Sequence, residues 1–359
     1  MTPLLAAFAR QQAWCEGVSP FTARLLARGQ IWLSGNPEAH AVLAAVASDP
    51  LAAAVALRWV AALHHLALRG CAPWADLWPP APAGASDAAL DGAIAMAWQT
   101  QRSHLGAALA LPPQTNEVQR SAALLPGLLH VAASTGLPLA LLEIGASAGL
   151  NLWCDRYRHE HGAWQWGHPD AALHLRAEWL GPPPPLGVDL RILRRAACDA
   201  HPVDIAQPAE RLRLASFIWP DQADRLARLA AAQPIAAACM AAEGMAVQAL
   251  PAVRFLAEQL APAATDGPAA PDVATVVMHS VVWQYIPAAE QAAITALLDA
   301  AGRLATAAQP LAWLRFEPPA ADEGVELRCR LWPDGRDRLL ARAHAHVQRI
   351  EWLAGGAAA

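Results

Sequence analysis

The sequence predicts an α/β protein in which a mostly parallel sheet, with an antiparallel C-terminal edge, follows an all-helical N-terminal region. Residues 1 to 115 carry helical patterns separated by turn residues and no alternating strand pattern. An apolar run at Leu139–Ile144 then leads into a turn of small residues, and further strand patterns recur with helical stretches between most of them. We therefore expect a helical N-terminal domain at 1–115 and an α/β domain at 116–359.

Composition narrows the class of function. The 359 residues carry a net charge of -5, and 16% of them are charged, so no basic field favours a phosphate backbone. We expect a small-molecule substrate and no nucleic-acid partner. The six cysteines lie far apart without a Cys-x-x-Cys spacing, which is typical of reduced thiols in a cytoplasmic protein.

The longest apolar stretch does not predict a membrane span. Leu51–Leu68 is interrupted by Arg58, His64 and His65 and consists largely of alanine. It suits a buried helix, and no membrane partner is expected.

The N-terminal helices have recognisable boundaries. Turn residues stand at Ser19-Pro20, Gly35-Asn36-Pro37 and Asp49-Pro50. After Pro112-Pro113 the pattern changes, and a helix from Asn116 to about Ser134 precedes the apolar run at Leu139.

Strand patterns follow that run at long intervals and predict a sheet of about seven strands. They lie at Leu190–Ala197, Leu212–Ile218, Pro234–Met240, Val273–His279, Leu311–Phe316, Val325–Trp332 and His346–Trp352. The last two alternate in polarity and are spaced for an antiparallel pair, which predicts the antiparallel edge.

The turn Gly145-Ala146-Ser147-Ala148-Gly149 is the strongest functional signal. It follows the acidic Glu143 and precedes a helical pattern from Leu150 to Arg158, where backbone can approach a ligand closely. Close packing of a strand on a helix alone also explains such a turn. The dinucleotide fingerprint fits poorly, because Leu150 stands where its third glycine belongs.

A serine hydrolase is the alternative enzyme class, because the turn also reads Gly-x-Ser-x-Gly with Ser147 as the nucleophile. That fold places several strands and an oxyanion loop before its nucleophile. Here about 115 residues of helical pattern precede the first strand, so the context favours another function.

An S-adenosylmethionine loop fits best. Such a loop carries an acid two residues before a run of small residues, and Glu143 would orient the ammonium group of the cofactor. Gly145, Ser147, Gly149 and Asn151 complete the expected cofactor-binding set of the turn.

Several blocks of the chain resemble one bacterial family. They are Thr115 to Arg120, Glu143 to Leu152, Phe217 to Gln222, His279 to Tyr285 and Trp313 to Pro318. These blocks are similar to those of the bacterial domain-of-unknown-function family 2332. The resemblance implies a Rossmann-like fold of the methyltransferase type behind a helical N-terminal region.

Two further acids are expected to contact the cofactor. Asp199 follows a predicted strand and would hold the ribose hydroxyls, with Glu178 as the alternative if residues 161 to 187 are not an insertion. Glu243, after the strand predicted at Pro234–Met240, would lie near the adenine; a solvated helix cap is its other interpretation.

The catalytic candidate is His279, at the predicted carboxyl end of a strand, where it would accept a proton from a nucleophilic substrate. Ser280, Trp283 and Tyr285 follow it as candidate substrate contacts, although buried aromatic side chains more commonly fill a core.

Asn116, Glu117 and Arg120 share one helical face at the start of the α/β domain. We expect them to clamp a substrate; an N-cap at Asn116 with a local Glu117–Arg120 pair is the simpler alternative. No metal site is predicted, because the histidine pairs lack the spacing of a ligand set. The sequence therefore predicts an S-adenosylmethionine-binding methyltransferase, with a serine hydrolase or a non-catalytic cofactor-binding protein as alternatives.

Overall fold

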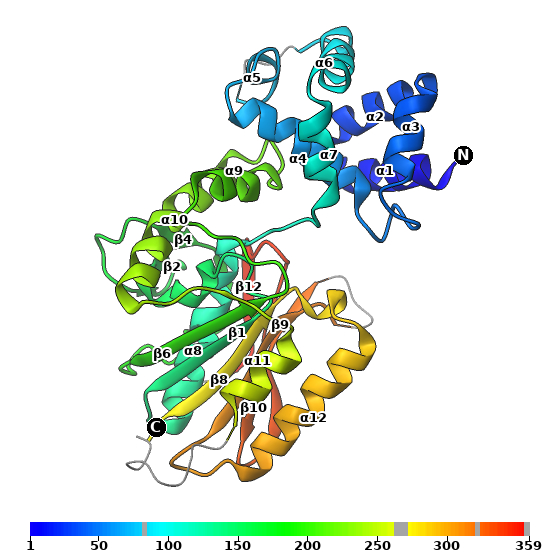
Figure 1. The fold of residues 1–359 in the computed structure, drawn as a ribbon. Helices are drawn as coiled ribbons and strands as arrows, with labels where there is room; N and C mark the ends of the chain where they lie inside the picture. The colour runs from blue at the N-terminus through cyan, green and yellow to red at the C-terminus, as the bar shows by residue number, and fades with distance from the viewer. Residues whose placement is uncertain (81–84, 262–271, 320–323, 355–359) are drawn as a thin grey trace. The chain divides into compact units, whose positions relative to one another are not determined.

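The computed structural model describes residues 1–80, 85–261, 272–319 and 324–354 and divides the chain into two compact units (Figure 1). Unit 1 comprises Met1–Thr115 and Ile205–Leu229, and unit 2 comprises Asn116–Asp204 and Ala230–Ala359. The protein is mixed α/β, with a helical N-terminal region and a large, mostly parallel sheet that has nine strands within the described residues.

Unit 1 is built from helices. Proline occupies the first turn of α1, α2 and α3, where its missing N–H would be unpaired in any case. The side chains of Thr2, Asn36 and Ser86 accept hydrogen bonds from the first turns of α1, α3 and α6. The helices are α1 (Pro3–Cys15), α2 (Pro20–Gly35), α3 (Pro37–Ala44), α4 (Val55–Leu68), α5 (Trp74–Leu77), α6 (Asp87–Thr100), α7 (Arg102–Ala110) and α9 (Pro208–Ser216).

A segment from the middle of the chain completes the core of unit 1. Trp219 belongs to the same buried cluster as Trp59 and packs edge-on against Trp14, with ring centroids 5.1 Å apart. The carboxylate of Asp221 accepts hydrogen bonds from the Ser19 hydroxyl and from the N–H of Phe21 at the start of α2. Ile205–Leu229 is therefore an integral part of the helical unit.

Unit 2 begins with η1 (Val118–Arg120) and α8 (Ser121–Thr135) and then alternates strands with helices. Its remaining elements are β1 (Leu139–Ile144), η2 (Leu150–Arg156), β2 (Arg158–Glu160), β3 (Gln165–Trp166), β4 (His174–Arg176), β5 (Glu178–Leu180), β6 (Ile192–Asp199), β7 (Gln248–Ala249), α11 (Ala252–Gln259), β8 (Ala274–Ser280), η3 (Trp283–Tyr285), α12 (Ala288–Leu304), β9 (Leu311–Glu317), β10 (Val325–Trp332), β11 (Arg336–Ala343) and β12 (Arg349–Trp352). The helix α10 (Ala223–Glu243) precedes β7.

The turn after β1 lies where the strand order changes direction: β6 is added on one side of β1 and β8 on the other. Within the described residues the order is β5-β12-β11-β10-β9-β8-β1-β6-β7. The strands β7, β6, β1, β8 and β9 are parallel, and β10 and β11 are antiparallel to their neighbours. β1 lies between β6 and β8, so its carboxyl end is a topological switch point, where open α/β sheets bind ligands.

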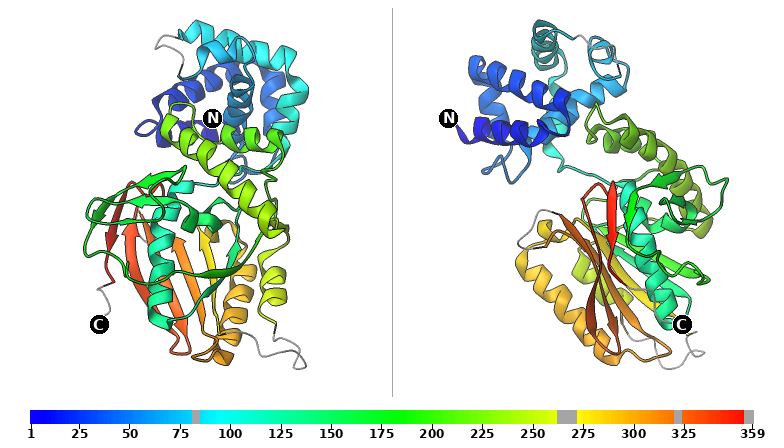
Figure 2. Two further views of the ribbon diagram at one scale, coloured as in Figure 1. Left: turned by 90° about the vertical axis from the view of Figure 1, so that its left-hand side faces the viewer. Right: turned by 180° about the vertical axis from the view of Figure 1, so that it is seen from behind.

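Helices cover both faces of the large sheet, which buries all six residues of β1. α8 crosses one face, as the view from behind shows (Figure 2), and α11 and α12 cover the other (Figure 1). On the second face Leu142 and Ile144 pack with Phe255 of α11 and Leu298 of α12. The two faces are therefore separate environments for polar side chains.

The structure confirms the strand at Leu139–Ile144 and an antiparallel C-terminal edge, and it corrects other predictions. The last two predicted strands, β10 and β12, do not pair with each other, because β11 lies between them and pairs with both. Leu212–Ile218 is not a strand, because most of it lies in α9, and Pro234–Met240 lies inside α10. Alanine is abundant in α10 and favours helix, and in both segments tertiary packing outweighs a short apolar run. The sheet also has more strands than the seven predicted, because β5, β7 and β11 join it.

Candidate functional site

The turn after β1 is a left-handed bend that the surrounding chain holds in place. Gly145, Ser147 and Gly149 have φ values of 64°, 53° and 70°. The N–H of Ala146 donates to the carbonyl of Cys198 at the end of β6 (3.0 Å). The turn is thus an extension of the carboxyl edge of the sheet, and glycine is needed at 145 and 149 because other residues rarely adopt such a φ.

Both glycines also permit close contact with side chains of the protein. A Cβ atom at Gly145 would lie 2.4 Å from Cγ2 of Val282, and one at Gly149 would lie 2.6 Å from Cε of Met240. The sequence predicts that this backbone approaches a ligand closely, which stays a prediction. In this structure the close approach serves packing against side chains from the segment after β8 and from α10.

A buried polar cluster surrounds this turn on the α8 face of the sheet. The Oδ1 atom of Asn116 accepts a hydrogen bond from the N–H of Leu150 (2.9 Å), which begins η2. Asn151 accepts a hydrogen bond from the hydroxyl of Ser121 (2.8 Å) and donates to the carbonyl of Glu117 (3.3 Å). Residues from the segment before α8, from α8 and from η2, far apart in sequence, thus meet beside the turn. We define the loop cluster as Asn116, Glu117, Arg120, Ser121, Glu143, Ser147, Leu150, Asn151, Asp199 and Ser280.

Arg120 joins this cluster to the end of β8. Its Nη1 donates to the carbonyl oxygen of Ser280 (3.0 Å), and Arg120, Glu117 and Ser280 are each at most 9% exposed. Asn116 caps η2 rather than its own helix. All four predicted substrate contacts on this side therefore take part in holding the turn and the strand end together.

Glu143 is the most unusual group of the loop cluster. It is 2% exposed, and its Oε2 is buried without a hydrogen-bond partner. Burial, and to a smaller extent the charge of Asp199, raise the pKa of this carboxyl to about 8 against the opposing effect of Arg120. A buried carboxyl oxygen with no partner is costly, so this position favours a cation that would pair with it.

Asp199 is the last residue of β6 and lies beside the turn, where the parallel pairing of β6 with β1 brings it. Its Oδ2 accepts from the N–H of Ser147 and its Oδ1 from the N–H of His201, both at 2.8 Å. Glu178, the alternative acid, lies in β5 at the opposite edge of the sheet and is within 3.8 Å of Arg349.

Glu243 is the last residue of α10 and belongs to a different ion-pair group. It accepts from Nη1 of Arg195 at 2.9 Å, and Asp155 accepts from Nη2 at 2.7 Å. The Arg195 guanidinium lies over the ring of Trp153, 4.4 Å from its centroid. The strand that was predicted to place Glu243 near an adenine is a helix, and the third parallel strand on that side is β7.

His279 lies on the other face of the sheet from the loop cluster. Successive side chains of a strand point to opposite faces, and His279 shares its face with Val277, which packs with α11 and α12. Its Nδ1 bonds to Oε1 of Glu317 (2.6 Å), and the indole N–H of Trp313 donates to its Nε2 (3.0 Å). Because Trp313 can only donate, Nε2 is the acceptor and both ring nitrogens are engaged.

Aromatic residues complete the surroundings of His279. Trp283 stacks on its ring at 5.1 Å with an interplanar angle of 17°, whereas Tyr285 is 74% exposed. A groove of about 410 Å³ is lined in part by His279, Trp283, Trp313 and Glu317. Arg330, one of the arginines that also line it, pairs with Asp299 at 2.7 Å.

Glu317 was not singled out from the sequence as a candidate. It ends β9, the parallel neighbour of β8, so the rule that the ends of parallel strands meet would have placed it beside His279. The same carboxylate accepts from the N–H of Val282 (3.1 Å), so it links His279 to the side chain that packs on Gly145.

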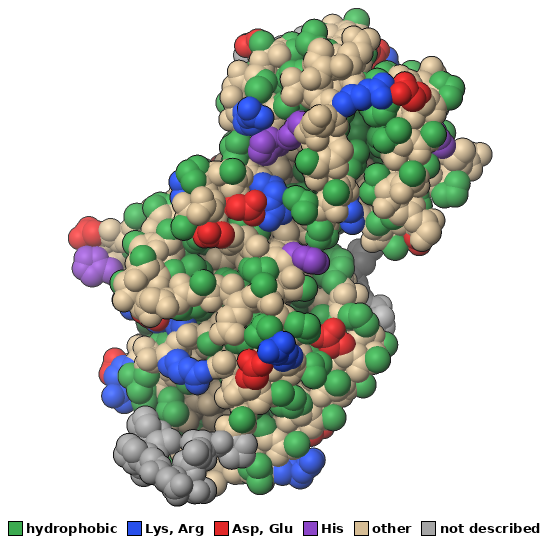
Figure 3. Space-filling view, in the orientation of Figure 1, with side chains coloured by type: hydrophobic (Ala, Val, Ile, Leu, Met, Phe, Trp, Pro, Cys, Tyr) green, Lys and Arg blue, Asp and Glu red, His purple; other side chains and the backbone are tan. Residues whose placement is uncertain are grey.

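Neither a metal-ligand group nor a membrane-spanning helix is found among the described residues. Residues 1–80, 85–261, 272–319 and 324–354 contain no group of three or more His, Cys, Asp or Glu side chains placed to hold a metal ion. Within the same ranges, no helix has both the length and the apolar character needed to cross a membrane. Basic and acidic side chains are interspersed on the face shown in Figure 3.

Comparison with known proteins identifies the family. No curated protein and no solved structure matches the chain. A family model described as "Uncharacterized protein conserved in bacteria (DUF2332)" matches residues 5–352, which is nearly the full length. The chain with its switch-point turn and buried carboxyl therefore belongs to this bacterial family.

Proposed function

We propose that unit 2 binds S-adenosylmethionine at the turn after β1 and transfers its methyl group to a small molecule. The observation that carries this proposal is Glu143, a buried carboxyl at the end of β1 with one oxygen that has no partner. The sheet order supports it too, because the turn stands at the switch point between β6 and β8.

The charges of the loop cluster are complementary to a cation. Glu117, Glu143 and Asp199 are acidic, and Arg120 is the single basic residue of the cluster as defined above. When bound, the cofactor would supply an electrophilic methyl group and a positively charged ammonium group. Glu143 would accept hydrogen bonds from that ammonium, and Asp199 would accept from the ribose hydroxyls.

Binding in this manner requires local rearrangement. Val282 and Met240 contact the turn, so their side chains would rotate away to leave the backbone open. The Asp199 carboxylate would exchange its hydrogen bond from the Ser147 N–H for one from the ligand. His279, on the other face with both ring nitrogens engaged, would orient the strand end rather than move a proton.

Calorimetry tests the proposal by measuring whether cofactor binding releases the proton of the Glu143 carboxyl. Because the pKa of Glu143 is raised to about 8, a bound ammonium would lower that pKa, and cofactor binding at pH 7 would release close to one proton. Titrations with S-adenosylmethionine in two buffers of different ionisation enthalpy measure this number directly.

The matched variants are Glu143→Gln and Glu351→Gln, the second on the exposed surface of β12. We expect Glu143→Gln to weaken binding about tenfold or more and to abolish proton release, with no change in Glu351→Gln. Absence of binding by the wild type, or equal affinity and proton release in Glu143→Gln, would refute the proposal. Substitution of Gly145 is uninformative, because its Cβ would collide with Val282.

A serine hydrolase using Ser147 is the second candidate. One observation favours it: Ser147 has a φ of 53°, the left-handed backbone found at strained nucleophile turns. A fluorophosphonate probe that labels the wild type but not Ser147→Ala would support this activity, and an unlabelled wild type excludes it. Binding of cofactor without product across a panel of acceptors would identify a non-catalytic binding protein instead.

A further inference from the structure

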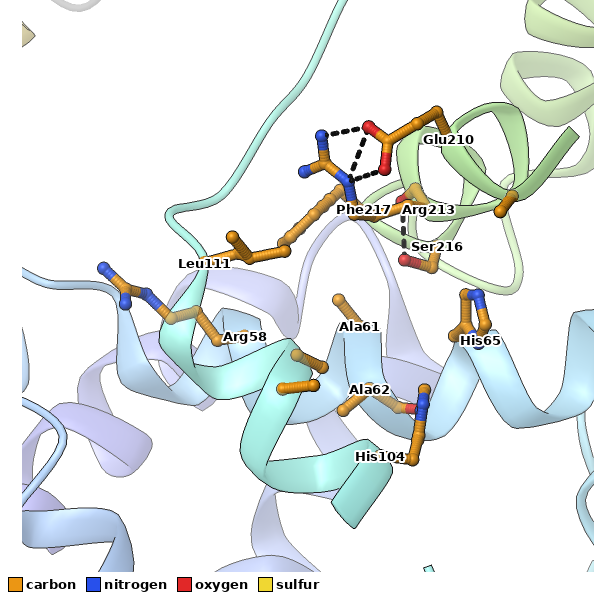
Figure 4. Close-up of a pocket in the computed structure, with 13 residues that line it drawn as sticks. Arg58, Ala61, Ala62, His65, His104, Leu111, Glu210, Arg213, Ser216 and Phe217 are labelled. Carbon is orange, nitrogen blue, oxygen red and sulfur yellow. Dashed lines mark hydrogen bonds and ion pairs between the residues drawn. The ribbon is translucent and has the colours of Figure 1, made fainter. Parts of the chain in front are cut away.

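Unit 1 contains a pocket of its own that the proposed methyl transfer does not use. The pocket has a volume of about 210 Å³ and lies between α4, α7 and α9 (Figure 4). That volume corresponds to about seven water molecules at about 30 Å³ each, which is below the range of drug-sized ligands. The pocket therefore suits a small molecule of about one ring.

The floor of the pocket follows from a repeated sequence pattern. α4 contributes Arg58, Ala61, Ala62 and His65, and these positions are spaced i, i+3, i+4 and i+7, which places them on one helical face. α7 contributes His104, Ala107 and Ala108, and Leu111 directly follows its last residue, so these positions have the same spacing, again with two central alanines. The four short side chains leave an apolar trough between polar ends.

One end of the trough carries a cation without a counterion. The Nη1 of Arg58 donates to the carbonyl of Leu109 at 3.0 Å, and its Nε is buried without a partner. Among the described residues, no carboxylate lies within ion-pair distance of Arg58, and burial lowers the pKa of its guanidinium. Glu210, the acid that lines the pocket, is already paired with Arg213 at 2.7 Å.

The other end carries two stacked imidazoles, as Figure 4 shows on the side opposite Arg58. The rings of His65 and His104 are 4.9 Å apart with an interplanar angle of 26°, and His104 donates to the carbonyl of Ala62 (2.9 Å). Nδ1 of His65 is buried without a partner. Arg58 and His65 are seven residues apart on α4, so the two polar ends are about 10 Å apart along the helix axis.

We propose that this pocket binds a small organic carboxylate with a flat apolar body. The body would lie on the alanine floor, with Phe217 and Leu111 as apolar walls. The carboxylate would pair with Arg58, and a hydroxyl at the far end of the ligand would hydrogen-bond to Nδ1 of His65. Such a ligand would satisfy both buried nitrogens and neutralise the charge of Arg58.

The test uses 4-hydroxybenzoate as the probe and its neutral analogue 4-hydroxybenzamide as the control ligand. Saturation-transfer NMR on the full chain detects contact, and calorimetry measures affinity. We expect 4-hydroxybenzoate to bind the wild type, and Arg58→Gln to weaken that binding about tenfold or more. The benzamide should bind wild type and Arg58→Gln with equal, weaker affinity.

A steric pair of variants separates pocket binding from surface binding. Ala107 lines the pocket and Ala41 lies on α3 outside it, and both are exposed helix residues. Ala107→Leu should abolish binding of 4-hydroxybenzoate, whereas Ala41→Leu should leave it unchanged. No saturation transfer to the probe at millimolar concentration, an equal effect of the two leucine variants, or an unchanged affinity in Arg58→Gln would overturn the proposal. Failure here would not affect cofactor binding by unit 2.

Discussion

Glu143 makes the stability of the protein depend on pH. The pKa of its carboxyl is about 8 in the folded protein and about 4.5 in the unfolded chain. Between these values the folded state holds a proton that the unfolded state has lost, so stability that is present below pH 4.5 is lost as the pH rises through about 8. In this range, each rise of one pH unit lowers the free energy of unfolding by about 1.4 kcal/mol.

We therefore predict that Glu143→Gln is less sensitive to alkaline pH than the wild type. Urea unfolding at pH 5 and pH 8 should show a fall in the free energy of unfolding of the wild type that the variant lacks, by a few kcal/mol. Glu351→Gln, an exposed change of the same kind, should retain the wild-type fall. Parallel curves for wild type and Glu143→Gln would contradict the assignment.

The residues around the turn were predictable from the sequence, but their hydrogen bonds were not. Glu143 directly precedes the turn, and Asp199 was placed beside it by the rule that the ends of neighbouring parallel strands meet. Asn116 was predicted only as part of a substrate clamp on a helix at the start of the α/β domain. Nothing in the sequence shows that Asn116 caps η2 or that Trp313 engages His279, because these contacts join segments more than 30 residues apart. Sequence spacing also could not assign His279 to the opposite face from Glu143.

At the scale of elements, the turn between β1 and η2 is held by a tight contact with Val282. We predict that Gly145→Ala lowers the free energy of unfolding by about 3 kcal/mol, because it adds left-handed backbone strain to a collision. Adding Val282→Ala to the Gly145→Ala variant should restore the part of this free energy that is lost through the collision with Val282. Urea unfolding measures both effects.

Gly92 provides the control for this prediction. It lies in α6 with open space around it, so Gly92→Ala should raise stability by about 0.5–1 kcal/mol. If Gly145→Ala were as harmless as Gly92→Ala, or if Val282→Ala gave no recovery, the contact would not be what constrains the turn.

Strands with a clear alternation of polarity or a continuous apolar run were predicted from the sequence, and strands with weaker patterns were missed. β1, β6, β8, β9 and β10 coincide with predicted strands to within two residues at each end. β11, which pairs with β10, was missed because it begins with the charged residues Arg336-Asp337-Arg338, which are not typical of a strand. The two strands wrongly predicted between residues 212 and 240 lie in α9 and in the alanine-rich α10, because a short apolar run is compatible with either a strand or a helix.

At the scale of the whole molecule, Asp221 ties the segment Ile205–Leu229 to the N-terminal helices. Its carboxylate receives the N–H of Phe21 at 3.0 Å, and α2 has no cap from its own Ser19 side chain. We predict that Asp221→Ala lowers the stability of unit 1 by about 1–2 kcal/mol. Tryptophan fluorescence during urea unfolding reports this change, because Trp219 is buried nearby.

Asp224→Ala is the matched control, because Asp224 is exposed three residues further along the chain. It should leave the unfolding midpoint close to that of the wild type. If both variants shifted the unfolding midpoint equally, Asp221 would contribute to stability only through its charge and not through its hydrogen bonds. The return of this segment to the helical unit had no signal in the sequence, because its residues resemble those of an ordinary helix between two strands.

The divided composition of unit 1 has a consequence for synthesis. Its first part ends at Thr115 and its second part ends at Leu229, so 114 more residues are translated before the unit is complete. At about 5–20 residues per second, the ribosome needs roughly 6–23 s for that stretch. During this time the N-terminal helices lack the contacts of Trp219 and Asp221, and the apolar surface that this segment covers is exposed and accessible to chaperones.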